Sequence, residues 1–303
     1  NEFNSHTANL IEIFSSLQGE GAYVGRRMTF VRFGSCNLKC RFCDTPQGMC
    51  TRDHCLIEKV PGSAKFDKIS NPVSAAQLCE MMSRFDDSIL SITGGEPLKQ
   101  AAFLEQWLPS QRPNRTILLE TNGVLHEELK ILLPNIDIIS MDFKLPSSTG
   151  EKEFWEEHSI FLQNSVASGK EIYIKIVVTP ETTDHDIEKV IRIITSINKY
   201  IPTFNSLLVQ RFDFKGNSAR QDKIPAEALQ RLFEGCPRPA PNAQALGHPV
   251  DLFLNSALAK ATLPYPADDT VSVGIIGGIH MVREVSGNLR PIQGTKTPYT
   301  PKI

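Results

Sequence analysis

Short apolar segments alternate with amphipathic segments through most of the chain, and this order restricts the folds available to it. The first expected strand is 28–33, and the others are 88–93, 116–120, 137–142, 171–178 and 206–210. The spacing of apolar residues predicts helices at 74–85, 100–108, 126–133, 151–167, 184–199 and 225–233. Such alternation is typical of parallel βα units. Six units are too few for a closed eight-stranded barrel, so the sequence predicts an α/β fold with a partial (β/α)6 TIM-like barrel.

The domain organisation follows from where this alternation begins and ends. Residues 1–9 are polar and tag-like, so we expect them to be disordered. One core domain is expected over 10–236, with a lid-like insertion over 46–71, which contains Pro, Gly and Asp and has no clear period. The pattern does not define a structure for the C-terminal extension, 237–303, apart from a candidate strand at 250–254.

Charge and hydropathy argue against two classes of partner. With 32 basic and 34 acidic residues among 303, the formal net charge is −2, which does not predict nucleic-acid binding. No apolar run is long enough to span a bilayer, and the polar N-terminus lacks the apolar core of a signal peptide. The seven cysteines are odd in number and partly clustered, which favours metal binding in a reducing compartment over disulfides. We therefore expect a cytoplasmic protein with no membrane partner.

Polar residues follow the carboxyl ends of the expected strands. They are Gly94, Gly95 and Glu96 after the second strand, Glu120, Thr121 and Asn122 at the third, Asp142 and Lys144 at the fourth, and Gln210 at the sixth. The sites of parallel barrels lie at this edge. These residues therefore outline one polar pocket, on the same rim as a cysteine-rich loop that follows the first strand.

That loop contains Cys36, Cys40 and Cys43 in the pattern C-x-x-x-C-x-x-C. Three thiolates on a tight loop can hold three irons of a [4Fe–4S] cubane, which leaves the fourth iron free to bind the amino and carboxylate groups of S-adenosylmethionine (SAM). The alternatives are three buried thiols or a zinc site completed by His54 or Cys50. The spacing and the position on the rim favour the cluster. A second metal site at Cys50, Cys55 and His54 is less favoured than unligated thiols.

The cysteine motif resembles that of the radical SAM superfamily. Together with Ile-Phe-Ser-Ser-Leu-Gln-Gly-Glu-Gly at 13–21, Phe-Val-Arg-Phe-Gly at 30–34 and Cys-Asp-Thr at 43–45, it resembles the 7-carboxy-7-deazaguanine synthase family, often called QueE. The resemblance runs from about residue 10 to residue 210. Related activating enzymes share parts of the 13–21 stretch.

The resemblance implies roles for individual residues. SAM would be bound by Gly94, Gly95, Glu96, Glu120, Thr121, Asn122 and Lys144, and we add Gln210 from its position on the rim. Thr45 would bind Mg²⁺, and Gln18, Gly19, Glu20 and Arg32 would bind the substrate. Two departures are visible: Asp142 replaces the serine of the family's Ser-x-Lys contact, and 250–256 lacks the family's Gln-x-His element.

The resemblance also implies an activity. SAM would be cleaved reductively to methionine and a 5′-deoxyadenosyl radical. The substrate would be 6-carboxy-5,6,7,8-tetrahydropterin, and a Mg²⁺-dependent ring contraction with loss of ammonia would give 7-carboxy-7-deazaguanine for queuosine or other 7-deazapurines. An electron donor such as flavodoxin or ferredoxin and a homodimer are further expectations. The alternatives are a radical SAM enzyme that acts on a protein or peptide, and a non-catalytic protein with a structural metal.

Overall fold

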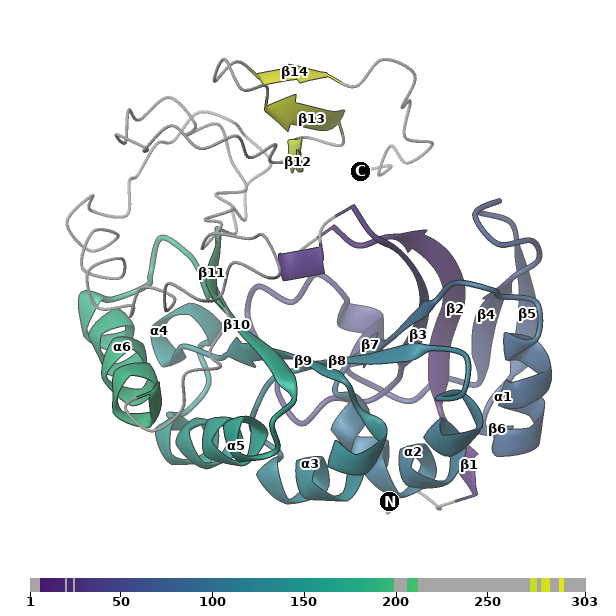
Figure 1. The fold of residues 1–303 in the computed structure, drawn as a ribbon, viewed down its shortest axis with the longest axis horizontal. Helices are drawn as coiled ribbons and strands as arrows, with labels where there is room; N and C mark the ends of the chain where they lie inside the picture. Colours follow the sequence, from purple (N-terminus) through teal and green to yellow (C-terminus); the bar gives the residue numbers. More distant parts are fainter. Residues whose placement is uncertain are drawn as a thin grey trace.

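The computed structural model describes residues 6–19, 21–23, 25–198, 206–211, 273–276, 279–283 and 289–291. Six strands pair in parallel and in chain order: β3 (Arg27–Phe33), β7 (Ile89–Gly94), β8 (Thr116–Thr121), β9 (Ile138–Phe143), β10 (Glu171–Val178) and β11 (Ser206–Arg211). Figure 1 shows that they form a curved sheet. The predicted partial (β/α)6 barrel is confirmed.

Three further strands, which the sequence pattern did not predict, widen this sheet beyond β3. They are β2 (Leu10–Leu17), β4 (His54–Glu58) and β5 (Phe66–Ser70), and the full order is β11-β10-β9-β8-β7-β3-β2-β4-β5. β2 runs antiparallel to β3, β4 parallel to β2, and β5 antiparallel to β4. Nine described strands thus form one sheet. Its first two strands along the sequence, β2 and β3, pair as an antiparallel hairpin.

The helices lie along the convex face of the sheet (Figure 1). They are α1 (Ala75–Met82), α2 (Ala101–Trp107), α3 (His126–Leu132), α5 (Trp155–Ala167) and α6 (Asp184–Asn198), with one-turn α4 (Pro146–Thr149) after β9. Short 3-10 turns occupy Gly21–Tyr23, Pro46–Gly48, Pro97–Gln100, Leu108–Ser110 and Leu133–Asn135. Ser74 starts α1 through a capping box with Gln77, as its position before the apolar run predicts.

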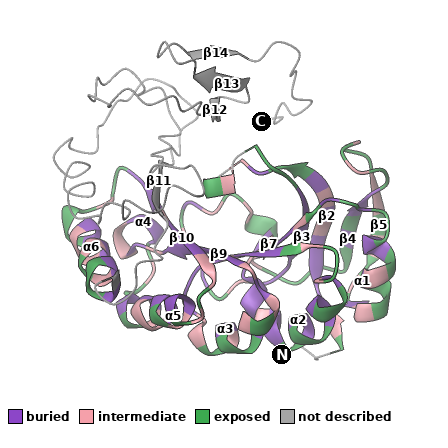
Figure 2. Cartoon of the chain, in the orientation of Figure 1, coloured by how far each residue is buried: buried purple, intermediate pink, exposed green. Residues whose placement is uncertain are grey.

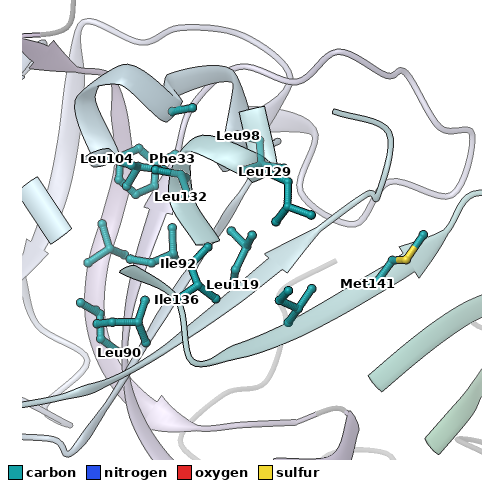
Figure 3. Close-up of a cluster of buried hydrophobic side chains, with 14 of the residues drawn as sticks. Phe33, Leu90, Ile92, Leu98, Leu104, Leu119, Leu129, Leu132, Ile136 and Met141 are labelled. Carbon is teal, nitrogen blue, oxygen red and sulfur yellow. The ribbon is translucent and has the colours of Figure 1, made fainter. Parts of the chain in front are cut away.

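The main core lies between the sheet and these helices. Figure 3 shows Leu90, Ile92 and Leu119 of the strands beside Leu104, Leu129 and Leu132 of the helices, and all are buried. Strands β3, β8, β9 and β10 are largely buried, whereas the helices expose their outer sides (Figure 2). This burial explains why the strands read as nearly continuous apolar runs.

The insertion at 46–71 differs from the irregular lid that its sequence suggested. Part of it forms β4 and β5 at the side of the sheet, and Cys55 and Ile57 of β4 are fully buried in the core. Only Gly48 and Met49 of this segment line the cavity described below.

The folded core also begins before residue 10. β1 (Thr7–Ala8) pairs with β6 (Val73–Ser74), and the Asn9 backbone N–H donates to Gln100 Oε1 at 2.8 Å. Residues 6–9 therefore belong to the fold, although their polar sequence gave no such signal.

Part of the C-terminal extension forms strands β12 (Val273–Ile276), β13 (Ile279–Arg283) and β14 (Leu289–Pro291), which pair as a three-stranded antiparallel sheet. The expected helix at 225–233 and the candidate strand at 250–254 lie outside the described residues.

Candidate active site

A cavity of about 350 Å³ opens at the carboxyl ends of the parallel strands. Thirteen of the predicted site residues line it: Gln18, Gly19, Arg32, Cys36, Cys40, Cys43, Thr45, Gly94, Gly95, Glu120, Thr121, Asn122 and Lys144. Of the other three, Glu20 lies outside the described residues, and Glu96 is not part of the lining. Gln210 lies on β11 beside Val177 of β10, which does line the cavity.

The cysteine loop is held from several sides. Lys99 Nζ donates to Ser35 Oγ at 2.8 Å, and Asn122 Nδ2 donates to Asn37 Oδ1 at 2.7 Å. The Arg41 backbone N–H donates to the Thr149 carbonyl at 2.8 Å. The loop is thus tied to the segments after β7, β8 and β9, which fixes it against the sheet.

The three thiols suit iron–sulfur ligation. Cys36 and Cys40 pack against an apolar group of Leu38, Val124 and Phe154. Burial raises the pKa of Cys36, and it raises the pKa of Cys40 to about 11. A thiolate in such surroundings needs a strongly bound cation, which cluster iron supplies. In the part of the chain that the structure describes, no three His, Cys, Asp or Glu side chains surround one point as ligands of a single ion. A cubane needs a different arrangement, with one thiolate on each of three irons.

Gly94 and Gly95 bring the end of β7 against the cysteine loop. The Gly95 and Glu96 backbone N–H groups donate to the Phe33 and Ser35 carbonyls, each at 2.9 Å. Gly94 has φ of +132°, and a Cβ atom at Gly95 would overlap the carbonyl oxygens of Gly48 and Ser35. Only glycine permits this approach, which leaves bare backbone on the cavity wall.

The carboxylate of Glu96, one of the predicted SAM-binding residues, binds other parts of the protein. The side chain is fully buried and accepts hydrogen bonds from the Leu98 N–H at 3.0 Å, Thr121 Oγ1 at 2.9 Å and the Asn122 N–H at 2.8 Å. Burial raises its pKa to about 7, against the opposing effect of these bonds. The carboxylate therefore joins the ends of β7 and β8 and does not face the cavity. Binding of SAM by the backbone of Glu96 stays a prediction.

Glu120, which is predicted to bind SAM, contacts Gln18, which is predicted to bind the substrate. Gln18 Nε2 donates to Glu120 Oε1 at 2.9 Å, and Ser91 Oγ donates to the same oxygen at 2.8 Å. Gln18 comes from the N-terminal hairpin and Glu120 from the end of β8, so the two predicted binding sets meet at this bond.

Arg32 lies beside Thr45 in another part of the cavity lining. Arg32 Nη1 donates to Thr45 Oγ1 at 3.1 Å, and Thr45 Oγ1 donates to Asp44 Oδ1, also at 3.1 Å. Arg32 Nε lies 3.3 Å from Glu12 Oε1, and its guanidinium lies 5.6 Å from the centre of the Phe14 ring. A cation and two hard oxygen donors therefore lie side by side.

Two lysines, Lys144 and Lys175, share the carboxylate of Asp142 in the cavity lining. Asp142 Oδ2 lies 2.8 Å from Lys144 Nζ and 3.6 Å from Lys175 Nζ, while buried Oδ1 has no hydrogen-bond partner among the described residues. Burial lowers the pKa of Lys144, but Asp142 and Cys40 outweigh it, and the net pKa is raised. Lys175 was not among the predicted site residues. The sequence feature that could have indicated Lys175 is a charged residue inside the apolar run of β10. The strand register places this residue next to Asp142.

Comparison with known proteins places the chain among described families. The model of the radical SAM superfamily matches residues 30–194. The 7-carboxy-7-deazaguanine synthase of Geobacter sulfurreducens is 40% identical over 232 residues, which cover 74% of this chain and 90% of the relative. The synthase of the same name from Methanocaldococcus jannaschii is 31% identical over 244 residues, covering 74% and 88%.

The chain belongs to the radical SAM superfamily and, within it, to the 7-carboxy-7-deazaguanine synthase family.

Membership of this family makes the chain a lyase that uses a [4Fe–4S] cluster and SAM. The arrangement of the cavity fits both groups, since three thiols border bare glycine backbone and polar strand ends. No helix among the described residues has the length and apolar character needed to cross a membrane.

Proposed function

We propose that this chain converts 6-carboxy-5,6,7,8-tetrahydropterin to 7-carboxy-7-deazaguanine and ammonia. The ring contraction is redox-neutral overall, because the product differs from the substrate only by the ammonia lost. The observation that carries the proposal is the union of both predicted binding sets in one cavity, joined by the hydrogen bond between Gln18 and Glu120.

On the substrate side, Arg32 is the group for the carboxylate, since a guanidinium can bind it through two parallel hydrogen bonds. The Gln18 amide and the Glu120 carboxylate present a donor and acceptor edge that matches the amide-like edge of a pterin. The apolar rings of Phe14 and Phe30 stack at 5.1 Å and line the same part of the cavity. This wall suits a flat heterocycle with one anionic substituent.

Mg²⁺ would bind at Thr45, with substrate oxygens and waters completing its shell. A cation there would compete with Arg32 for Thr45 Oγ1. We propose that Arg32 then turns to the substrate carboxylate, so that metal and substrate bind together. The Asp44 carboxylate, next to Thr45, would balance the added charge.

On the cofactor side, the bare backbone at Gly94 and Gly95, the Asn122 side chain and the Lys144 ammonium would hold SAM. When bound, the cluster and SAM together supply the 5′-deoxyadenosyl radical that abstracts hydrogen from the substrate. The protein orients the two ligands and keeps water and thiols away from the reacting carbon. An external electron donor such as flavodoxin or ferredoxin, a homodimer and a cytoplasmic location stay predictions.

An anaerobic assay tests the proposal. Reconstituted protein is mixed with SAM, Mg²⁺, a reductant and 6-carboxytetrahydropterin, and the products are read by mass. The expected product is lighter than the substrate by one ammonia. If SAM gives 5′-deoxyadenosine and the pterin returns unchanged, the substrate assignment fails and a protein or peptide substrate becomes the better hypothesis.

A matched pair of variants tests the substrate side. Arg32→Met should raise KM for the pterin and leave the affinity for SAM unchanged. Arg192→Met removes an exposed arginine of α6, whose partner is Glu188, and should change neither. An unchanged pterin KM in Arg32→Met would contradict the role of Arg32.

A further inference from the structure

His158 connects two parts of the cavity wall without facing the cavity itself. It lies in the first turn of α5 and is fully buried. Its Nδ1 atom lies 2.9 Å from the Gly123 carbonyl oxygen, and its Nε2 atom lies 3.1 Å from the Lys144 backbone nitrogen. Gly123 follows Asn122 at the end of β8, and Lys144 follows β9. One imidazole therefore spans two neighbouring strand ends.

The partners of His158 determine its protonation state. A carbonyl oxygen can only accept, so Nδ1 must carry the hydrogen. A backbone N–H can only donate, so Nε2 must be unprotonated. The ring is thus the neutral Nδ1–H tautomer. A proton on Nε2 would face the Lys144 N–H and break that bond.

The surroundings favour the same state. The ring packs 4.6 Å from the centre of Phe143 and 6.5 Å from that of Phe154. The charged groups that act on it are Asp142 and Lys144, which have opposite effects. Burial is the largest influence and lowers the pKa of His158 to about 4, so the neutral ring persists at neutral pH.

The turn at Gly123 is shaped to admit this ring. Gly123 has φ of +69°, and a Cβ atom there would lie 3.2 Å from His158 Nδ1 and 2.9 Å from the Met141 side chain. Because Asn122 and Lys144 both line the cavity, the separation of their backbones sets the width of the wall between them.

We propose that His158 is a positioning residue that holds the Asn122–Gly123 turn and Lys144 in register for SAM. It acts through two backbone groups and touches neither ligand. The inference rests on the proposed binding of SAM by Asn122 and Lys144. It adds a residue of α5, outside the cavity, to those that determine affinity for the cofactor.

Three substitutions separate the two hydrogen bonds. His158→Asn places an amide N–H near the Nδ1 position and keeps the bond to Gly123. His158→Gln places an amide oxygen near the Nε2 position and keeps the bond to Lys144. His158→Phe fills the volume and loses both. Ser165→Ala is the matched control, since Ser165 is also buried on α5 and its Oγ donates to the Phe161 carbonyl at 2.8 Å.

The readout is the affinity of the reconstituted, reduced protein for SAM, measured anaerobically from the change in the electron paramagnetic resonance spectrum of the cluster. Loss of one bond should weaken SAM binding about fivefold, and His158→Phe should weaken it by about tenfold or more. Iron content and the pterin KM at saturating SAM should stay at the parent values. Ser165→Ala should bind SAM as the parent does.

Parent SAM affinity in the His158 variants would overturn the inference, and Lys144→Met shows whether the proposed location of SAM fails with it. If His158→Phe lowers Tm but binds SAM with parent affinity, the residue is merely structural. Lys144→Met is measured alongside: if it too leaves SAM affinity unchanged, the proposed location of SAM fails. If Lys144→Met weakens binding and the His158 variants do not, the location stands and the positioning role of His158 fails.

Discussion

Replacing Glu96 with glutamine should remove part of the pH dependence of folding stability. Burial raises the pKa of this carboxyl from 4.5 to about 7, so the folded protein binds the proton more tightly than the unfolded chain does. The stabilising contribution of that proton is fully present below pH 4.5. It is lost as the pH rises through 7.

The size of the effect follows from the two pKa values. Between pH 5 and pH 8 the contribution of Glu96 to the free energy of unfolding should fall by about 2 to 3 kcal/mol. Glutamine has no proton to release in this range. Relative to the parent, Glu96→Gln should therefore gain that amount of stability between pH 5 and pH 8.

Glu96→Gln will also change the free energy of unfolding by an amount that does not depend on pH. The glutamine oxygen can accept from Leu98 and Thr121, but its NH₂ group then faces the Asn122 N–H. Buried donors left without acceptors cost about 1 to 3 kcal/mol each. The variant should thus be less stable than the parent at pH 5, with a smaller deficit at pH 8.

Urea unfolding of parent and variant at pH 5, 6, 7 and 8 measures the difference, and every other titrating group cancels in the comparison. Glu105→Gln, at an exposed position of α2, is the control and should run parallel to the parent. Parallel curves for Glu96→Gln as well would refute the reasoning, because Glu96 would then ionise alike in both states.

Two further predictions concern the cysteine loop and the core. Gly95→Ala should lower the iron content after reconstitution, because the added carbon displaces Gly48 or Ser35. Gly19→Ala should load normally, since no described residue apart from its chain neighbours has an atom within 4 Å of the added carbon. Equal iron contents would show that the loop tolerates the shift. Leu104→Ala, at a fully buried position of α2, should cost about 2 to 5 kcal/mol in urea unfolding, and a cost below 1 kcal/mol would contradict the packing described.

Much of the fold could be predicted because the parallel strands are buried on both faces. Their apolar runs at 116–120 and 171–178 match β8 and β10 closely, and Ser74 marked the start of α1. β4 and β5 escaped prediction for a physical reason. They form the edge of the sheet, where exposed residues interrupt the apolar pattern.

The candidate site could be predicted as a set of residues but not as a set of contacts. Strand ends share one rim, so thirteen of the predicted residues line the same cavity. The orientation of the Glu96 side chain depends on hydrogen bonds donated by Leu98, Thr121 and Asn122. No local sequence pattern predicts these bonds. His158 was missed because a histidine among the apolar residues of a helix carries no signal of its partners.

The sequence by itself predicted a ligand set for the cluster and located most strands of the barrel, since both depend on residues close together in the chain. Tertiary structure alone decided which side chains meet. Gln18 and Glu120 are 102 residues apart and become neighbours only through the order of the strands. The same holds for Lys175 beside Asp142 and for His158 between Gly123 and Lys144. Such contacts depend on how the whole sheet and its helices pack, because local preferences do not specify distances between distant segments.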